Sequence, residues 1–220
     1  MEEWGDVVGD WLRQDLAARL RGRTKRELIE SMLVRAPHAP AAEKLVIALE
    51  AYPLFYLLLA SEHPTSIWII DQGEKVSSAE ILTPEMRRRR WHSTNITIDD
   101  CEGLTDAAPD FVAMVTSWRS LLVIRHEFAH VVTTFFTSHQ REALGQLYLR
   151  AHALNLFPEP LARESVGEYF ACALSYLFFD DLSQELAQFD TLLYRFVTRL
   201  INRAEDVSRG LQSEDWSRSC

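Results

Sequence analysis

The sequence predicts a predominantly helical α+β protein with a small sheet. Apolar residues recur at helical spacing in the first sixty residues and again across the second half of the chain. Between these regions lie two short runs rich in β-branched residues, at 66–71 and 94–99, which are typical of strands. The chain has 220 residues, 47% of them hydrophobic. That size suits one globular domain, with or without a helical extension.

Composition argues against several classes of function. The net charge is −9, so nucleic acid is not an expected partner, since binding it needs a basic surface. Three widely spaced cysteines, Cys101, Cys172 and Cys220, do not form a disulfide framework and indicate a reducing compartment. The acidic N-terminus lacks the features of a secretory signal, and the apolar run at 45–60 is shorter than the about 20 residues of a spanning helix. We therefore expect no membrane span. We expect a cytoplasmic protein, or one delivered to another cell without a signal peptide.

The chain begins with residues that favour helices. An amphipathic first helix is predicted by seven apolar residues at helical spacing: Trp4, Val7, Val8, Trp11, Leu12, Leu16 and Leu20. Thr24 followed by Glu27 is a capping-box pattern. It predicts that a second helix starts there and runs to about Arg35.

The next elements are a helix and two strands. A third helix is predicted over 41–60, with a kink or an end near Pro53. The run at 66–71 ends at a Gln-Gly turn signal and predicts a strand. Residues 94–99 alternate between polar and apolar, so they predict a half-exposed strand. This strand has few partners, and we expect it at a sheet edge, where an extended peptide can pair with it.

The second half of the chain is predicted to be helical throughout. A long apolar helix over 111–136 starts at Asp110 as N-cap. Further helices are predicted over 143–156, 164–179 and 182–204. We therefore divide the chain into an N-terminal helical region (1–62) packed on a central domain (63–205), followed by a polar tail (206–220).

The long predicted helix contains the pattern His126-Glu127-Phe128-Ala129-His130. Residues four apart lie on the same face of a helix, so both imidazoles can bind one metal ion. Glu127 is then placed to take a proton from a water activated by that metal. The alternative is a pair of buried histidines satisfied by hydrogen bonds. We favour a zinc site, because the helical context that the motif needs is present.

A catalytic zinc usually has three protein ligands and a position for water. Glu168 is the first candidate for the third ligand, because it lies early in the next strongly apolar helix. An unpaired carboxylate would be costly to bury there. The alternative is a glutamate on the surface at the start of a helix. The predicted site thus has His126, His130 and Glu168 as zinc ligands and Glu127 as the catalytic residue.

The motif at 126–130, followed by Glu168-Tyr169-Phe170-Ala171, resembles the motif pair of the gluzincin metallopeptidases. Among these it is most similar to the catalytic domain of anthrax lethal factor and related proteins, over residues 96–201. The resemblance implies a zincin-like fold, mostly helical, with a small sheet whose edge strand lines the cleft. It implies that His126, His130 and Glu168 bind zinc and that Glu127 is the general base.

The chain departs from this family at two positions. The family has a catalytic tyrosine seven residues before the third ligand, where this chain has Leu161. Four residues remain candidates for stabilising the oxyanion: Arg163, His152, Tyr169 and Tyr194. The family also favours an acidic residue four positions after the ligand, where Cys172 stands. A shifted register would repair this, with Glu164 as the ligand and Glu168 as its partner.

These features predict a zinc-dependent endopeptidase that hydrolyses a protein substrate bound along a sheet edge. Three rivals remain. One is a catalytically degenerate zincin that acts as a protein-binding or regulatory module. Another is a deformylase-like hydrolase that takes the upstream Cys101 as a metal ligand. The third is a purely structural helical protein. No pattern in the sequence predicts the oligomeric state.

Overall fold

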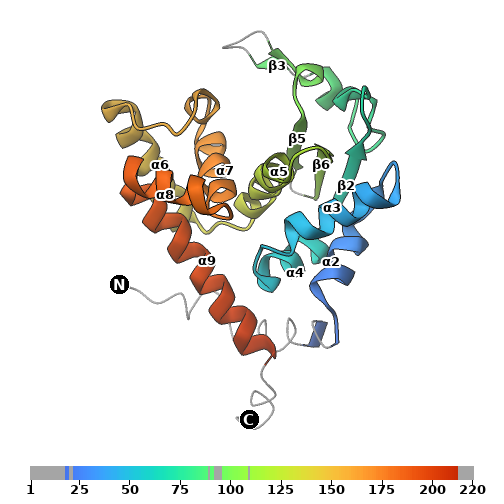
Figure 1. Cartoon of the computed structure of the whole chain (residues 1–220), viewed down its shortest axis with the longest axis horizontal. Helices are drawn as coiled ribbons and strands as arrows, with labels where there is room; N and C mark the ends of the chain where they lie inside the picture. Colours follow the sequence, from blue (N-terminus) through green and yellow to red (C-terminus); the bar gives the residue numbers. More distant parts are fainter. Residues whose placement is uncertain (1–17, 20–21, 89, 92–95, 109, 213–220) are drawn as a thin grey trace.

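The computed structural model describes residues 18–19, 22–88, 90–91, 96–108 and 110–212. They form a mostly helical α+β fold with one four-stranded sheet (Figure 1), as the sequence predicts. The helix predicted over 4–20 lies outside the described residues, except for Ala18 and Arg19, which are helical. None of the described helices is long and apolar enough to cross a membrane.

Three helices come first: α2 (Lys25–Met32), α3 (Ala39–Leu49) and α4 (Leu54–Glu62). The predicted capping box is present, with the backbone N–H of Glu27 donating to the hydroxyl of Thr24. The predicted helix over 41–60 is divided into α3 and α4, and Pro53 is the N-cap of α4. The extension of the second helix to Arg35 is wrong. Residues Leu33–Arg35 form strand β1, because pairing with a neighbouring strand outweighs the local helical signal.

The four strands of the sheet lie in the order β1-β2-β6-β5. The last three are β2 (Thr65–Ile70), β5 (Gly103–Ala108) and β6 (Phe111–Ser117). Strands β1, β2 and β6 are parallel, and β5 pairs antiparallel with β6. The N-terminal region therefore contributes β1 to the same sheet as the rest of the chain, and the division at residue 62 stays a prediction.

The single helix predicted over 111–136 is wrong. Its first part is β6, which is almost entirely buried between β2 and β5. An apolar run without alternation fits a buried strand as well as a buried helix, so its sequence could not distinguish them. Helix α5 (Leu121–Thr134) begins instead at Ser120, whose hydroxyl accepts hydrogen bonds from the first backbone N–H groups of the helix.

The strand predicted over 94–99 is much shorter than expected. Strand β4 (Ile96–Thr97) pairs with β3 (Arg90–Trp91) in a separate two-stranded sheet, and Ile98–Asp100 form a 3-10 turn. Residues 94 and 95 lie outside the described residues. The edge of the main sheet next to β6 is β5, which was not predicted, because Gly, Asp and Ala in its sequence are poor strand formers.

Four helices complete the fold: α6 (Ser138–Leu154), α7 (Val166–Tyr176), α8 (Asp180–Phe189) and α9 (Thr191–Gln212). The predicted last helix is thus divided in two at Asp190. This buried carboxylate accepts hydrogen bonds from the Tyr169 hydroxyl and the backbone N–H of Leu193. Helix α9 continues beyond residue 205, so the first part of the predicted polar tail is helical.

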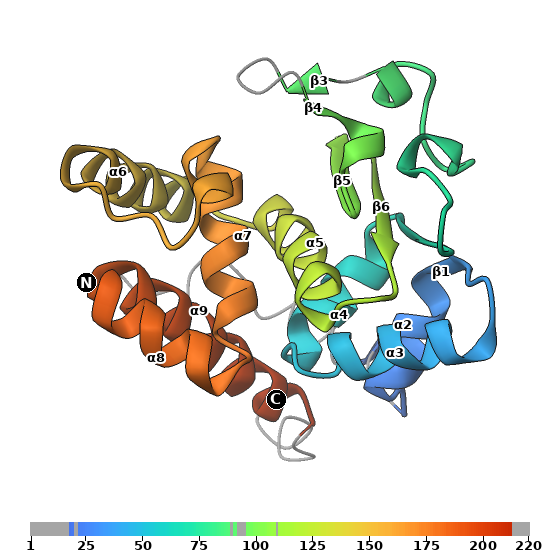
Figure 2. The same cartoon turned by 45° about the horizontal axis from the view of Figure 1, so that its top comes forward.

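Helix α5 lies between the sheet and α7 in both views (Figures 1 and 2), and it contacts both. The larger core includes Tyr52, Phe128, Tyr169 and Phe170, all fully buried. A smaller cluster that includes Trp68 and Val115 lies on the sheet away from this core. Packing on both sides fixes α5, and with it the residues of the predicted motif.

Candidate metal centre

Helix α5 presents His126 and His130 one turn apart on the same face. Their Nε2 atoms are 3.2 Å apart, and 13% and 18% of their side chains are exposed. Phe128 and Val132, on other faces of the helix, are buried in the core. The core therefore holds the helix in an orientation that leaves both imidazoles near the surface.

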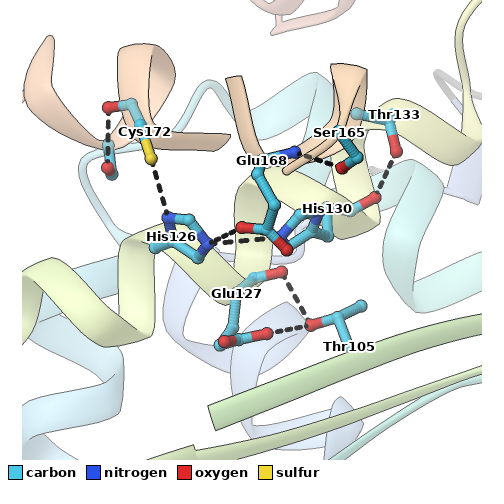
Figure 3. Close-up of polar contacts among 9 residues, drawn as sticks. Thr105, His126, Glu127, His130, Thr133, Ser165, Glu168 and Cys172 are labelled. Carbon is cyan, nitrogen blue, oxygen red and sulfur yellow. Dashed lines mark hydrogen bonds and ion pairs between the residues drawn. The ribbon is translucent and has the colours of Figure 1, made fainter. Parts of the chain in front are cut away.

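Glu168 reaches these histidines from the first turn of α7 (Figure 3). The hydroxyl of Ser165, the N-cap, accepts a hydrogen bond from the Glu168 backbone N–H at 3.1 Å and so starts the helix there. Glu168 Oε2 lies 2.9 Å from Nε2 of His126 and 3.5 Å from Nε2 of His130. Among the described residues, these three form the one cluster whose ligand atoms could share a metal ion.

The two rival ligands are outside this cluster. Glu164 is exposed in the turn before α7. Cys101 is half-buried, and its thiol lies 3.7 Å from the carbonyl oxygen of Thr97. The geometry therefore favours neither the shifted register nor a cysteine ligand.

The cluster fits zinc. A tetrahedral zinc with bonds of about 2.0–2.1 Å separates its ligand atoms by about 3.4 Å. The three separations here are 2.9, 3.2 and 3.5 Å. The partial exposure of all three side chains leaves the cluster accessible to a water as fourth ligand, as in catalytic rather than closed structural sites.

The pKa of the Glu168 carboxyl group is consistent with a role as a metal ligand. Burial acts to raise its pKa, but hydrogen bonds and charge from His126 and His130 outweigh burial and lower the pKa to about 2. The carboxylate is thus ionised at physiological pH, which is the state that binds a metal.

Glu127 lies beside the cluster, and only 7% of the residue is exposed. Burial raises the pKa of its carboxyl group to about 7, although the charge of His126 and a hydrogen bond from Thr105 act to lower it. A cation on the neighbouring ligands would lower this pKa. A bound cation thus favours the ionised form of Glu127, which is the form that accepts a proton as a general base.

Two residues of strand β5, Gly103 and Thr105, lie against the Glu127 side chain. Neither was predicted from the sequence. The Thr105 hydroxyl lies 2.8 Å from Glu127 Oε2 and 2.9 Å from the Glu127 carbonyl oxygen (Figure 3). A Cβ on Gly103 would stand only 2.6 Å from Glu127 Cγ and Oε1. No signal in the sequence pointed to either residue, because β5 itself was not predicted.

The second ring nitrogen of His126, Nδ1, faces Cys172. The Cys172 thiol lies 3.9 Å from His126 Nδ1. Burial and the nearby charge of Glu159 raise the pKa of the thiol. The acidic residue that the family favours at this position is therefore replaced by a thiol with a carboxylate beyond it.

Two of the four candidates for stabilising an oxyanion are engaged elsewhere. The Tyr169 hydroxyl donates to the buried Asp190 at 2.6 Å. The Arg163 guanidinium donates to Asn155 at 2.6 Å and stacks over the Phe157 ring. Both side chains are thus committed to contacts outside the cluster.

The other two candidates, His152 and Tyr194, pack against aromatic rings and the core. The ring of His152 packs against the rings of Tyr148 and Phe157. Tyr194 is half-buried on α9 and packs against the core. Leu161, at the position of the family's tyrosine, is 43% exposed. The residue that would stabilise an oxyanion stays unassigned.

Comparisons with known proteins identify the fold. No protein-family model matches the sequence, and no curated protein matches it. Among solved structures, the chain is similar to the Pro-Pro endopeptidase PPEP-2 from Paenibacillus alvei, with a TM-score of 0.57 and 19% sequence identity. The similarity covers 79% of this chain and 99% of that protein. It shows that the chain shares the fold of that endopeptidase. The narrower resemblance to the lethal factor family stays a prediction.

Proposed function

We propose that the protein is a zinc-dependent endopeptidase. The observation that carries this proposal is the convergence of His126, His130 and Glu168 on one point, with the buried Glu127 beside them. The likeness of the fold to an endopeptidase supports the same class of activity. The first observation concerns four side chains, and the second concerns the path of the backbone over 79% of the chain.

The zinc ion would be held by His126, His130 and Glu168. When bound, it would supply Lewis-acid chemistry that activates water and polarises a peptide carbonyl. Glu127 takes one proton from the water whose oxygen adds to the carbonyl carbon. As the C–N bond breaks, Glu127 returns that proton to the leaving amine.

The substrate is proposed to be an extended protein segment that pairs with the outer edge of β5. Within the described structure, β5 pairs with β6 on one side only. Gly103 and Thr105 of the same strand touch Glu127, so a peptide on this edge would lie next to the proposed base. PPEP-2 is named a Pro-Pro endopeptidase, and peptides with consecutive prolines are therefore the first substrates to test.

The second candidate function is a zinc-binding module without catalytic activity. Leu161 favours it, because an exposed leucine cannot donate a hydrogen bond where the family has a catalytic tyrosine. Zinc in the purified protein, with no hydrolysis across a broad peptide library, would support this function over the first.

Metal analysis tests the ligands. The purified protein should hold about one zinc per chain, and His126→Ala or His130→Ala should remove it. Glu168→Gln should weaken zinc binding strongly, whereas the matched variants Glu164→Gln and Cys101→Ser should keep the metal. Full zinc in either histidine variant would refute the assignment, and loss of zinc in Cys101→Ser would favour the deformylase-like alternative.

Peptide hydrolysis tests the base. Glu127→Gln should keep the zinc and the fold, because glutamine is nearly isosteric with glutamate. Turnover should fall by about 10²–10⁴-fold, the usual contribution of a general base. Unchanged turnover in this variant would show that the mechanism is wrong even if the metal site is right.

A further inference from the structure

Strand β5 touches the Glu127 side chain at two successive positions on the same side of the sheet, Gly103 and Thr105. We propose that these two residues position the carboxylate of Glu127 for proton transfer. The proposal rests on the function proposed above, and it gives β5 a role beyond substrate pairing. Gly103 supplies space for the Glu127 side chain, and Thr105 supplies a hydrogen bond to its carboxylate.

Gly103 is required by contact rather than by backbone conformation. A Cβ at this position would lie 2.6 Å from Glu127 Cγ and Oε1 and 2.8 Å from Cδ. All three atoms belong to the side chain of Glu127, so the clash falls on that side chain and not on the backbone of α5. Any larger residue at position 103 should therefore displace the proposed base and leave the strand intact.

Thr105 fixes the direction of the carboxylate. Its hydroxyl carries one proton and lies 2.8 Å from Glu127 Oε2 and 2.9 Å from the Glu127 carbonyl oxygen. The hydroxyl thus ties β5 to the backbone and the side chain of the same residue. With Oε2 bonded to Thr105 and Oε1 against Gly103, the carboxylate has a defined orientation.

The Thr105 hydroxyl bonds to Glu127, and the atoms nearest to a Cβ on Gly103 are also those of Glu127. Effects on the base and on metal binding should therefore separate. Gly103→Ala should lower kcat by about 10²-fold, as expected for a reacting group displaced by about 1 Å. Thr105→Val should lower kcat by about ten- to a hundredfold, because a hydrogen bond to a charged group is lost. Both variants should keep about one zinc per chain and an unchanged KM, and Thr105→Ser should recover most of the lost activity.

Two matched controls exist in the chain. Thr65 lies in the same sheet on β2, and its buried hydroxyl has no hydrogen-bond partner among the described residues. Gly145 lies in α6, where a Cβ would meet nothing within 4 Å. Thr65→Val and Gly145→Ala should therefore leave kcat and KM unchanged.

The decisive kinetic test is a double variant. If Thr105 acts through Glu127, then adding Thr105→Val to Glu127→Gln should cause no further loss of kcat. A multiplicative loss would overturn the proposal, since Thr105 would then act independently of the base.

Crystal structures of Gly103→Ala and Thr105→Val give a readout that does not need activity. We expect the Glu127 carboxylate to leave its position while His126, His130 and Glu168 keep theirs. A carboxylate that stays in place in both variants would overturn the proposal. If the wild-type protein hydrolyses no peptide, the proposed function fails, and these structures still decide whether β5 positions Glu127.

Discussion

At the scale of single residues, the neighbour of the motif on α5 is a buried arginine. Arg125 is 8% exposed, and its guanidinium donates to the carbonyl oxygens of Ala48 at 3.1 Å and Phe178 at 3.0 Å. These carbonyls lie in the last turn of α3 and just after α7. The guanidinium also stacks over the Phe179 ring at 4.5 Å. One side chain thus joins the ends of two helices to the helix that carries both histidines.

The substitution Arg125→Met should test whether these hydrogen bonds stabilise the fold. Methionine preserves much of the side-chain volume but leaves two buried carbonyls without their donor. Each unsatisfied group costs about 1–3 kcal/mol, so we expect the free energy of unfolding to fall by about 2–4 kcal/mol. Urea denaturation measures the difference. The exposed Arg119 is the control, since Arg119→Met should change stability by less than about 0.5 kcal/mol. Equal effects of the two substitutions would show that the buried contacts contribute nothing specific.

At the scale of elements, an ion pair joins β1 to the turn after β2. The Arg35 guanidinium donates to both carboxylate oxygens of Glu74, each at 2.7 Å, and lies over the Trp68 ring. The Arg35 hydrogen bond, with one from the Asp71 backbone N–H, lowers the pKa of Glu74 to about 2. A folded-state pKa below the ordinary value means that the pair stabilises the fold above the ordinary pKa. That stabilisation is lost as the pH falls toward 2.

Glu74→Gln should therefore destabilise the protein at pH 7, and the difference from wild type should vanish as the pH falls from about 4.5 to about 2. Both side chains of the pair are about one third exposed, so solvent screening should limit the loss to less than about 1 kcal/mol. Chemical denaturation at several pH values measures it, with Glu85→Gln as an exposed control. A difference that persists at pH 2 would assign the stabilisation to something other than the charge of Glu74.

Sequence predicted the elements whose signals are local. Thr24 and Glu27 mark the start of α2, and the four-residue spacing of His126 and His130 predicts that their imidazoles meet. Strand β6 was assigned to a helix because burial on both faces removes the alternation that marks a strand. Its partner β5 was missed because pairing with β6, rather than strand propensity, holds it in place.

The candidate site shows the same contrast between residues with a local sequence signal and residues placed only by packing. Glu168 was a candidate because an acidic residue in an apolar helix needs a partner, and the structure brings it to both histidines. Gly103 and Thr105 carry no such signal, since a glycine and a threonine are ordinary residues in a loop or a strand. Only the packing of β5 against α5 shows that they touch Glu127.

At the scale of the whole molecule, α5 lies between two groups of elements (Figure 2), which also contact each other directly through α4 and α9. The sheet with α2, α3 and α4 lies on one side, and α6 to α9 lie on the other. The three candidate ligands come from α5 and from α7 across this boundary. Glu168 stands in the first turn of α7, so a metal held there would add a cross-link between α5 and α7 to the contacts that α4 and α9 already make.

Removal of the metal should therefore weaken the whole fold. A ligand that binds only the folded state adds about 2.7 kcal/mol to stability at a free concentration one hundred times its Kd. We expect the chelated protein to unfold several degrees below the zinc-loaded protein in calorimetry or thermal circular dichroism. His130→Ala should unfold at one temperature with or without zinc, because it lacks a ligand. Glu127→Gln should keep the full zinc-dependent increase, because Glu127 is proposed as a base and not as a ligand. Identical unfolding of the wild-type protein in zinc and in chelator would show that the cluster holds no metal in the folded state.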